Sequence, residues 1–279
     1  MLLVLDIGNS NAVVGVYQGA RLRRSWRFAS NAHRTADEYG VLLEDFFKQS
    51  GLKPSQVTAA ILASVVPPLV PVFEDALRRL FKVQAMVVSP KLDLGLEVLT
   101  RNPEEVGADR LVNAVAGFHL YGGPLLVLDF GTATTVDAVS GTGQYLGGAI
   151  APGVAISIEA LVSRTAKLPR IEMAKPADPI GDSTLEAMRS GIYYSTLGAT
   201  RELCLRLGEA LARRDGRRPK VIATGGLSYW LPGEELGIQA VVPDLTLQGL
   251  RLIHERLSAP RKPLRRAKAP ALRAGKARP

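Results

Sequence analysis

The pentapeptide LLVLD occurs twice in this chain, at residues 2–6 and 125–129, and each copy runs into a glycine turn. The first copy continues as Ile7-Gly8-Asn9-Ser10, and the second continues as Phe130-Gly131-Thr132-Ala133. A second apolar run follows each turn, so that a unit of strand, Asp-x-Gly turn and strand is repeated. Repetition of one supersecondary unit predicts two similarly folded halves that face each other.

The Asp-x-Gly turn has a chemical use as well as a structural one. A glycine after a strand-end aspartate lets backbone N–H groups approach a phosphate, because no β-carbon intervenes. The aspartate, which is Asp6 in the first copy, can hold a hydrated divalent cation that bridges phosphates. A single turn of this kind is most simply a structural hairpin. Two copies after an identical pentapeptide instead indicate an ATP-binding cleft between two domains.

Hydrophobic periodicity places strands at the start of each half and alternates helices with strands after them. The predicted strands are residues 2–6, 12–17, 26–29, 59–66, 83–88, 125–129, 135–139, 144–150, 221–224 and 241–242. The predicted helices are residues 35–50, 70–81, 108–120, 154–162, 185–211 and 248–257. We expect the long segment 185–211 to break near Gly191 or Gly198. The pattern predicts an α/β protein with mixed sheets.

The composition, which is 47% apolar but only 6% aromatic, predicts a sizeable and mostly aliphatic core. The single cysteine, Cys204, lies between leucines of a predicted helix, and we interpret it as a buried small hydrophobe. One cysteine allows no intramolecular disulfide, which fits a reducing cytoplasm. No apolar stretch approaches the length of a membrane span, and the N-terminus lacks the basic region of a signal peptide. We therefore expect no membrane partner.

The net charge of +9 is concentrated at the C-terminal end of the sequence. Residues 258–279 carry eight Lys or Arg and no acidic residue, which leaves a net charge of +1 for residues 1–257. This tail has few large apolar residues and is predicted to be disordered. A basic tail can bind RNA or anionic surfaces nonspecifically. The nearly neutral remainder gives no indication of a specific nucleic-acid partner.

Several common catalytic motifs are missing from the sequence. The absence of GxxxxGK[ST], of GxGxxG after a strand and of GxSxG argues against a P-loop fold, a dinucleotide-binding fold and an α/β-hydrolase. The three histidines, His33, His119 and His254, are far apart and lack metal-ligand spacing. Elimination leaves the carboxylates and the glycine turns as candidates for chemistry.

Two glycine clusters and one Asp-Arg pair stand beside the repeated turns. Residues 147–153 lead into a predicted helix, and Thr224-Gly225-Gly226 follows a predicted strand. Each cluster is either a tight turn or a place where the backbone passes close to a nucleotide. Asp109 lies in the first turn of a predicted helix, where an acid complements the helix macrodipole. Next to Arg110, Asp109 is also a candidate general base beside an anion-binding arginine.

Taken together, these segments resemble the type III pantothenate kinases, which belong to the superfamily of acetate kinase, sugar kinases, Hsp70 and actin. The matching segments are residues 6–11 (DIGNSN), 35–40 (TADEYG), 64–68 (SVVPP), 107–110 (GADR), 129–135 (DFGTATT), 147–153 (GGAIAPG) and 224–226 (TGG). They follow one another in unbroken order from residue 1 to about residue 257, and their combination is highly specific. One departure is Ser10, where many relatives have threonine, and this change is conservative.

The resemblance implies two RNase H-like domains, residues 1–108 and 109–257, with a cleft between them, followed by the basic tail 258–279. It implies ATP-dependent phosphorylation of pantothenate to 4'-phosphopantothenate, the first step of coenzyme A synthesis. It further implies Mg²⁺ and a monovalent cation, K⁺ or NH₄⁺, as cofactors. The family is homodimeric, with the pantothenate pocket near the dimer interface.

The resemblance also implies roles for individual residues. The residues that would contact ATP are Asp6, Ile7, Gly8, Asn9, Ser10, Asn11, Ala12, Val13 and Thr132. Asp6 would lie near Mg²⁺, and Asp129 would bind the monovalent cation. The residues that would line the pantothenate site are Gly107, Ala108, Asp109 and Arg110, with Asp109 as the proton acceptor. Thr184 would contact the substrate from the start of a helix.

Two alternative functions stay open at this stage. The first is another enzyme of the superfamily, such as a sugar kinase, an acetate kinase or a polyphosphate phosphatase, although the GADR segment and the short chain count against it. The second is a nucleotide-binding regulator without turnover, because the family includes members first described as accessory factors for transcription. The intact Asp109 and the two phosphate turns favour an enzyme.

Overall fold

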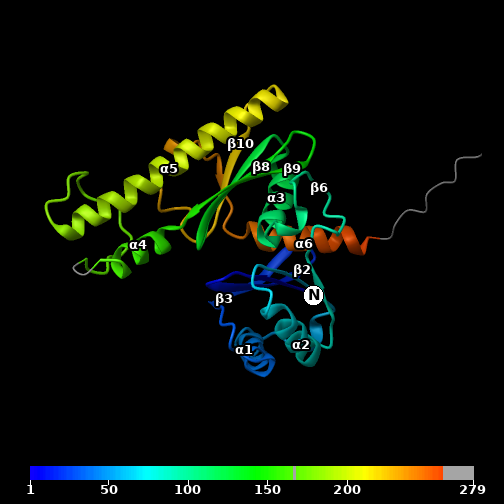
Figure 1. Ribbon diagram of the computed structural model, residues 1–279. Helices are drawn as coiled ribbons and strands as arrows, with labels where there is room; N and C mark the ends of the chain where they lie inside the picture. Colours follow the sequence, from blue (N-terminus) through cyan, green and yellow to red (C-terminus); the bar gives the residue numbers. More distant parts are fainter. Residues whose placement is uncertain (166–167, 260–279) are drawn as a thin grey trace, which may run out of the picture.

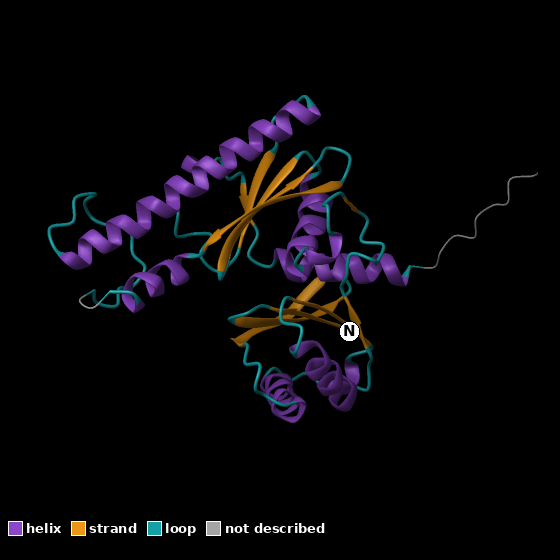
Figure 2. Ribbon diagram, in the orientation of Figure 1, coloured by secondary structure: helices purple, strands orange, loops and turns teal. Residues whose placement is uncertain are grey.

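The structure, a computed structural model, describes residues 1–165 and 168–259, which form two lobes that are each built on a mixed β-sheet (Figures 1 and 2). From residue 260 onward, the predicted basic tail lies outside the described residues. Within the part of the chain that is described, no helix is both long enough and apolar enough to cross a membrane.

The first sheet has five strands in the order β3-β2-β1-β4-β5. Their bounds are β1 Leu2–Ile7, β2 Asn11–Gln18, β3 Arg21–Ala29, β4 Ala59–Ser64 and β5 Ala85–Val87. The central strand β1 is antiparallel to β2 and parallel to β4.

The second sheet has six strands in the order β11-β10-β7-β8-β9-β6. Their bounds are β6 Glu97–Val98, β7 Leu125–Phe130, β8 Ala133–Val139, β9 Gln144–Pro152, β10 Lys220–Thr224 and β11 Ala240–Val241. The strand β7 is antiparallel to β8 and parallel to β10. Two-residue β6, which the sequence pattern did not indicate, pairs in parallel with β9 at the edge.

The two copies of LLVLD form β1 and β7, which hold equivalent places in the two sheets. Each opens an antiparallel meander and pairs on its other side with a parallel strand. The prediction of two similar RNase H-like halves is therefore confirmed, whereas a division of the chain at residue 108 stays a prediction. Because the two turns follow equivalent strands, each sheet has an aspartate and a glycine turn at the carboxyl end of its central strand, β1 or β7.

Helices α1 (Ala36–Gln49) and α2 (Leu69–Phe81) cover the outer face of the first sheet (Figure 1). The capping box at the start of α1 joins Thr35 and Glu38, whose carboxylate accepts a hydrogen bond of 2.8 Å from the Thr35 N–H. Apolar side chains of both helices pack on alternate residues of β1; these are Leu3, Leu5 and Ile7. The intervening residues of β1, including Val4 and Asp6, therefore point to the opposite face.

Helix α5 (Thr184–Asp215) covers the outer face of the second sheet and is 32 residues long without interruption. The predicted break near Gly191 or Gly198 is thus wrong. A glycine inside a helix costs only about 1 kcal/mol relative to alanine. The helix recovers more than this from the packing of residues such as Tyr193 and Leu197 on the sheet. The predicted burial of Cys204 in the same cluster is confirmed.

The remaining elements complete the fold. Helix α3 (Ala108–Tyr121) precedes the second sheet, α4 (Val154–Ser163) follows β9, and α6 (Leu245–Ser258) closes the described chain. Short 3-10 helices lie in the connections between these elements, at Pro54–Gln56, Pro103–Glu105 and Gly233–Leu236. In Figure 1, α4 and the start of α5 form an arm that projects away from α3 and α6.

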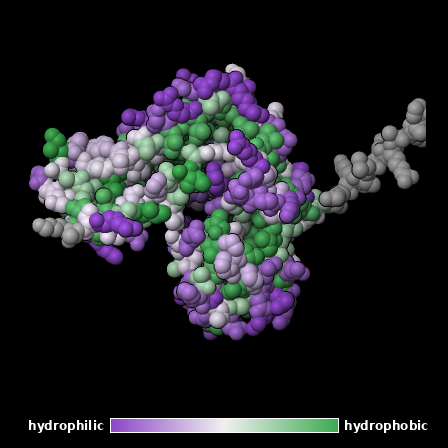
Figure 3. All heavy atoms as spheres, in the orientation of Figure 1, coloured by the Kyte–Doolittle hydropathy of each residue, from purple (hydrophilic) through white to green (hydrophobic). Residues whose placement is uncertain are grey.

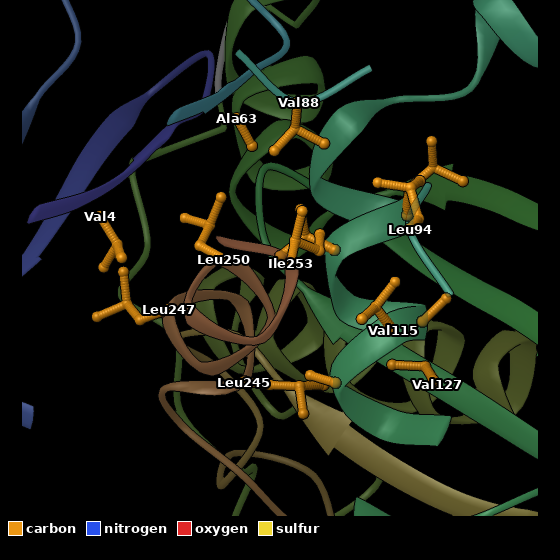
Figure 4. Close-up of a cluster of buried hydrophobic side chains, with 14 of the residues drawn as sticks. Val4, Ala63, Val88, Leu94, Val115, Val127, Leu245, Leu247, Leu250 and Ile253 are labelled. Carbon is orange, nitrogen blue, oxygen red and sulfur yellow. The ribbon is translucent and has the colours of Figure 1, made fainter. Parts of the chain in front are cut away.

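Helices α3 and α6 lie between the two sheets and join them through one hydrophobic cluster. Figure 4 shows α6 between β1 and α3, with Leu247 next to Val4 on one side and Ile253 toward α3 on the other. Gly249 makes this joint possible, because a β-carbon at that position would clash with the backbone carbonyl of Val112 in α3. The two helix backbones are therefore in direct contact.

We predict that Gly249→Ala lowers the free energy of unfolding by about 1–3 kcal/mol, the usual cost of overpacking a core. The matched control is Gly40→Ala in α1, where a β-carbon would meet nothing within 4 Å. That change should be neutral or stabilise the protein by up to about 1 kcal/mol. Urea denaturation of the two variants measures both effects, and equal stabilities would contradict the close helix contact.

Candidate functional site

The two glycine turns, which are more than a hundred residues apart in the sequence, meet in the structure. The Ser10 hydroxyl of the first turn and the Thr132 hydroxyl of the second turn are hydrogen-bonded at 2.9 Å. Both side chains are exposed, so that the contact lies at the surface of the cleft. The structure thus brings together the residues that the repeated motif predicted would grip a phosphate from two sides.

Asp6 and Asp129, which stand at the ends of β1 and β7, face this junction, and Asp109 lies close enough to repel both. Burial and the charges of Asp109 and Asp129 raise the pKa of Asp6 to about 8. Burial and the charge of Asp109 raise the pKa of Asp129 to about 7. Burial also raises the pKa of Asp109, against the effect of the adjacent Arg110. The cleft therefore gathers more negative charge than its own cations balance.

Such a site suits a metal cation that binds together with a phosphate-bearing substrate. Within residues 1–165 and 168–259, no group of three or more His, Cys, Asp and Glu side chains could hold a metal ion by itself. Mg²⁺ commonly uses one or two carboxylates and completes its coordination with water and substrate phosphates. Asp6 and Asp129 suit that mode, because a nearby cation would relieve their mutual repulsion.

The turn Thr224-Gly225-Gly226 closes the site from the side of β10. Thr224 pairs with Asp129 in the parallel register of β10 and β7. Gly225 has a positive φ of 92°, and a β-carbon there would lie 2.5 Å from Oδ1 of Asp129. Only glycine fits such a position. The turn therefore leaves the backbone open next to the carboxylate, as a nucleotide pocket requires.

Asp129 is held in place through one of its two oxygens. The side-chain amide of Asn113, on α3, donates a hydrogen bond of 2.9 Å to Oδ2. The hydroxyl of Thr246, on α6, donates to Oδ1 of Asn113 at 2.7 Å and so orients the amide. The other oxygen of Asp129 points toward the glycine turns, where it can meet a ligand.

Asp109 and Arg110 stand at the first turn of α3, after the N-cap Gly107. The backbone N–H of Arg110 donates to Oδ1 of Asp109 at 2.7 Å. Gly107 contributes no side-chain cap, so that Asp109 supplies the acid that the helix start favours. The structure places Asp109 electrostatically close to both Asp6 and Asp129, and thus beside the phosphate turns.

The guanidinium of Arg110 is fixed by a second acid, Asp137 of β8. Its Nε donates to Oδ1 of Asp137 at 2.9 Å, and Nη2 lies 2.6 Å from the same oxygen. The Tyr145 hydroxyl also donates to this oxygen, at 2.7 Å. Asp137 is only 1% exposed, and burial raises its pKa against the pull of Arg110. Breaking such a buried pair typically costs about 3–5 kcal/mol.

Sequence reasoning missed Asp137, Asn113, Tyr145 and Thr246. One signal was available for Asp137, which interrupts the apolar strand Ala133–Val139 with an acid. Asn113 gave a weaker signal, as an amide on the apolar helix α3, where the other buried residues are nonpolar. Tyr145 and Thr246 gave no signal, because their partners lie far away in the sequence.

Thr184 is not brought together with the other predicted site residues. It begins α5 and lines a cavity of about 740 Å³ against α4. The lining of that cavity contains none of the residues of the turns or of the Gly107–Arg110 segment. In Figure 1, this region lies in the projecting arm, away from α3.

Comparison with known proteins identifies the family. A family model described as type III pantothenate kinase matches residues 2–206. This chain belongs to the type III pantothenate kinase family. A protein of Anaeromyxobacter sp. (strain Fw109-5), named type III pantothenate kinase, is 48% identical over 256 residues, which cover 92% of this chain and 99% of that relative. The family predicted from the sequence motifs is thereby confirmed.

Solved structures agree with the fold of this pantothenate kinase family member. A putative Baf family transcriptional activator from Campylobacter jejuni has a TM-score of 0.56 at 17% identity, and covers 91% of this chain and 98% of its own. A putative 2-dehydro-3-deoxygalactonokinase from Sinorhizobium meliloti has a TM-score of 0.54 at 12% identity, with 95% and 99% covered. At these identities the likeness concerns the fold alone.

Proposed function

We propose that this chain transfers the γ-phosphoryl group of ATP to the primary hydroxyl of pantothenate, the first step of coenzyme A synthesis. Family membership supports the substrate and the reaction. The contact between Ser10 and Thr132 supports the proposal structurally, because it joins the two glycine turns, and the charge of Asp109 acts on the strand-end aspartates that precede them. Phosphoryl transfer depends mainly on positioning and charge neutralisation, and this site offers both.

The residues divide into a nucleotide side and a substrate side. On the nucleotide side, residues 6–13 and Thr132 bind the phosphates of ATP, and the Gly225 turn leaves room beside them. On the substrate side, Gly107, Ala108 and Arg110 line the pantothenate pocket. Asp137 fixes Arg110, so that its remaining donors meet the substrate in one orientation. Asp6 would hold Mg²⁺ together with the nucleotide, and the ion would supply positive charge to the phosphate oxygens.

Asp109 takes the proton of the attacking hydroxyl. A general base works best when its pKa lies near the operating pH. Burial raises the pKa of Asp109 in that direction, while the Arg110 N–H keeps the carboxylate oriented. These features are consistent with a base rather than with a helix-end residue alone. A regulator that binds nucleotide without turnover has no use for a raised pKa at this position.

A monovalent cation, K⁺ or NH₄⁺, is proposed to bind at Asp129. The Asn113 amide holds one carboxylate oxygen and leaves the other toward the glycine turns. A cation there would favour the ionised form of a group whose pKa is about 7 without it. Backbone carbonyls of the turns can supply further oxygen ligands.

The chain is also proposed to act as a homodimer through the arm formed by α4 and the start of α5. Seven of the ten residues of helix α4 are apolar, yet Val154 is its only buried residue, and Ile156 and Leu161 are 41% and 38% exposed. Figure 3 shows apolar to neutral colours over much of this arm, and a hollow between it and the lower lobe. An exposed apolar face of this kind is typical of an interface. Dimerisation would bring Thr184 to a partner's substrate.

Asp109→Asn separates catalysis from the structural role at the helix start, because asparagine nearly preserves the shape of aspartate and its side-chain oxygen can accept the same hydrogen bond from the Arg110 N–H. Loss of the negative charge from the first turn should cost only about 0.3–1 kcal/mol. We predict stability and binding of an ATP analogue close to those of the wild type, with turnover reduced by at least about a hundredfold. Coupled ADP-release assays measure the rate, and thermal denaturation gives the control. Turnover within a few-fold of wild type would assign Asp109 a purely structural role.

Turnover of the wild type should require K⁺ or NH₄⁺, with Na⁺ a poor substitute, because the smaller ion mismatches a cage of fixed oxygens. Asp129→Ala should lose activity and keep its fold. Steady-state rates at matched ionic strength in the three chlorides test this, with circular dichroism of the variant as control. Equal wild-type rates in NaCl and KCl would contradict the assignment of a monovalent-cation site to Asp129.

Light scattering should give the protein twice the chain mass of 29.9 kDa. Leu161→Glu, on α4, should shift it toward monomer because a charge would be buried at the interface. The control is Leu120→Glu, a change at a leucine of α3 that is 44% exposed. It should leave the mass unchanged. If the two variants behave alike, the α4 arm is not the interface.

A further inference from the structure

Besides Arg110, the cleft contains a further cation, Arg27, which the proposed mechanism does not use. Arg27 lies on β3, the edge strand of the first sheet, and its side chain is exposed. Within the described residues, it forms no ion pair and donates no hydrogen bond, so the donors of its guanidinium are unused. Arginine presents five such donors in a planar fork that matches phosphate oxygens.

The strand register places Arg27 on the same face as Asp6. Asp6 pairs with Val13 in β2, and Val13 pairs with Arg27 in β3. Residues directly opposite each other in antiparallel pairs point to the same side of a sheet. Two strand spacings separate Asp6 from Arg27, about 10 Å between their backbones. Both side chains therefore emerge on the face that looks across the cleft.

The guanidinium also reaches the second sheet. A β-carbon built on Gly226 would lie 3.9 Å from Nη1 of Arg27. Gly226 lies two residues after Thr224, whose partner in the sheet is Asp129. The charge of Arg27 lowers the pKa of Asp6 and of Asp129, whereas the cation that lowers the pKa of Asp109 is Arg110. Arg27 thus stands on the nucleotide side of the site, and Arg110 on the substrate side.

We propose that Arg27 binds the polyphosphate of ATP, closing the nucleotide site from the edge of the first sheet opposite the Gly225-Gly226 turn. The inference rests on the proposed kinase function. The guanidinium of Arg27 supplies positive charge to a tetra-anionic nucleotide, which otherwise enters beside the two strand-end carboxylates Asp6 and Asp129. Because the guanidinium has no hydrogen-bond or ion-pair partner within residues 1–165 and 168–259, none of the contacts that these residues make must be broken for it to turn to the phosphates.

Isothermal titration of Arg27→Gln with Mg²⁺ and a non-hydrolysable ATP analogue, ADP or AMP tests the proposal. Loss of a charge-assisted contact should weaken binding of the ATP analogue by about tenfold to a hundredfold. Binding of AMP should stay within about twofold of wild type, and ADP shows whether the β-phosphate takes part. Arg27→Lys should lie between, because lysine keeps the charge but not the fork.

The matched control is Arg24→Gln, on the same strand. Arg24 pairs with Val16, whose side chain is buried under α1 and α2, so the Arg24 side chain lies on the face of the sheet that these helices cover. Arg27 lies on the other face. The affinities of Arg24→Gln should equal those of the wild type. In turnover assays, Arg27→Gln should lower kcat/KM for ATP and leave KM for pantothenate unchanged.

Three results would overturn the assignment. The first is affinity of Arg27→Gln for the ATP analogue within twofold of wild type. The second is an equal loss for AMP and the analogue, which would mean a distorted pocket. The third is a change confined to the pantothenate KM. The titrations need no turnover, so a wild-type protein that binds ATP but does not phosphorylate pantothenate would refute the proposed function and still test Arg27.

Discussion

The contact between α3 and α6 is the constraint on which the rest of the molecule depends. Gly249 lets the two helix backbones touch at Val112, and the apolar residues around them join the two sheets into one cluster. If the helices stood farther apart, the two sheet edges would separate as well. The hydrogen bond between Ser10 and Thr132 spans that distance with two short side chains and could not survive a wider spacing.

That geometry has an electrostatic consequence. Folding brings Asp6 and Asp129 to the same junction, with Asp109 close to both, and burial adds to their repulsion. An isolated protein would be more stable with apolar residues at these positions, because buried charges without partners are costly. The raised pKa values show that the cleft is unfavourable for three ionised carboxylates in the absence of a cation. Such a site therefore favours binding of a nucleotide together with its metal cation, because the cation reduces the repulsion among the carboxylates.

The sequence predicted the fold well because the deciding pattern is local. A repeated LLVLD followed by an Asp-x-Gly turn specifies a strand, a turn and a strand without reference to distant residues. The error at Gly191 and Gly198 arose where tertiary packing outweighs a local preference, since α5 packs on the sheet from Tyr193 to Leu211. Within the candidate site, Asp6 and Asp109 stood out by their motifs. Tyr145 and Thr246 did not, because their roles come from partners that only the fold supplies.

A chain of hydrogen bonds links the contact between α3 and α6 to the candidate site. Thr246 belongs to α6, Asn113 to α3 and Asp129 to β7, and two hydrogen bonds connect them in that order. Since the hydroxyl of Thr246 donates to the amide oxygen, the amide nitrogen must face the carboxylate. One oxygen of Asp129 is thereby fixed by the same two helices that hold the sheets together, and the other is left to the glycine turns. The packing that sets the distance between the lobes thus also sets the orientation of a group at the phosphate site.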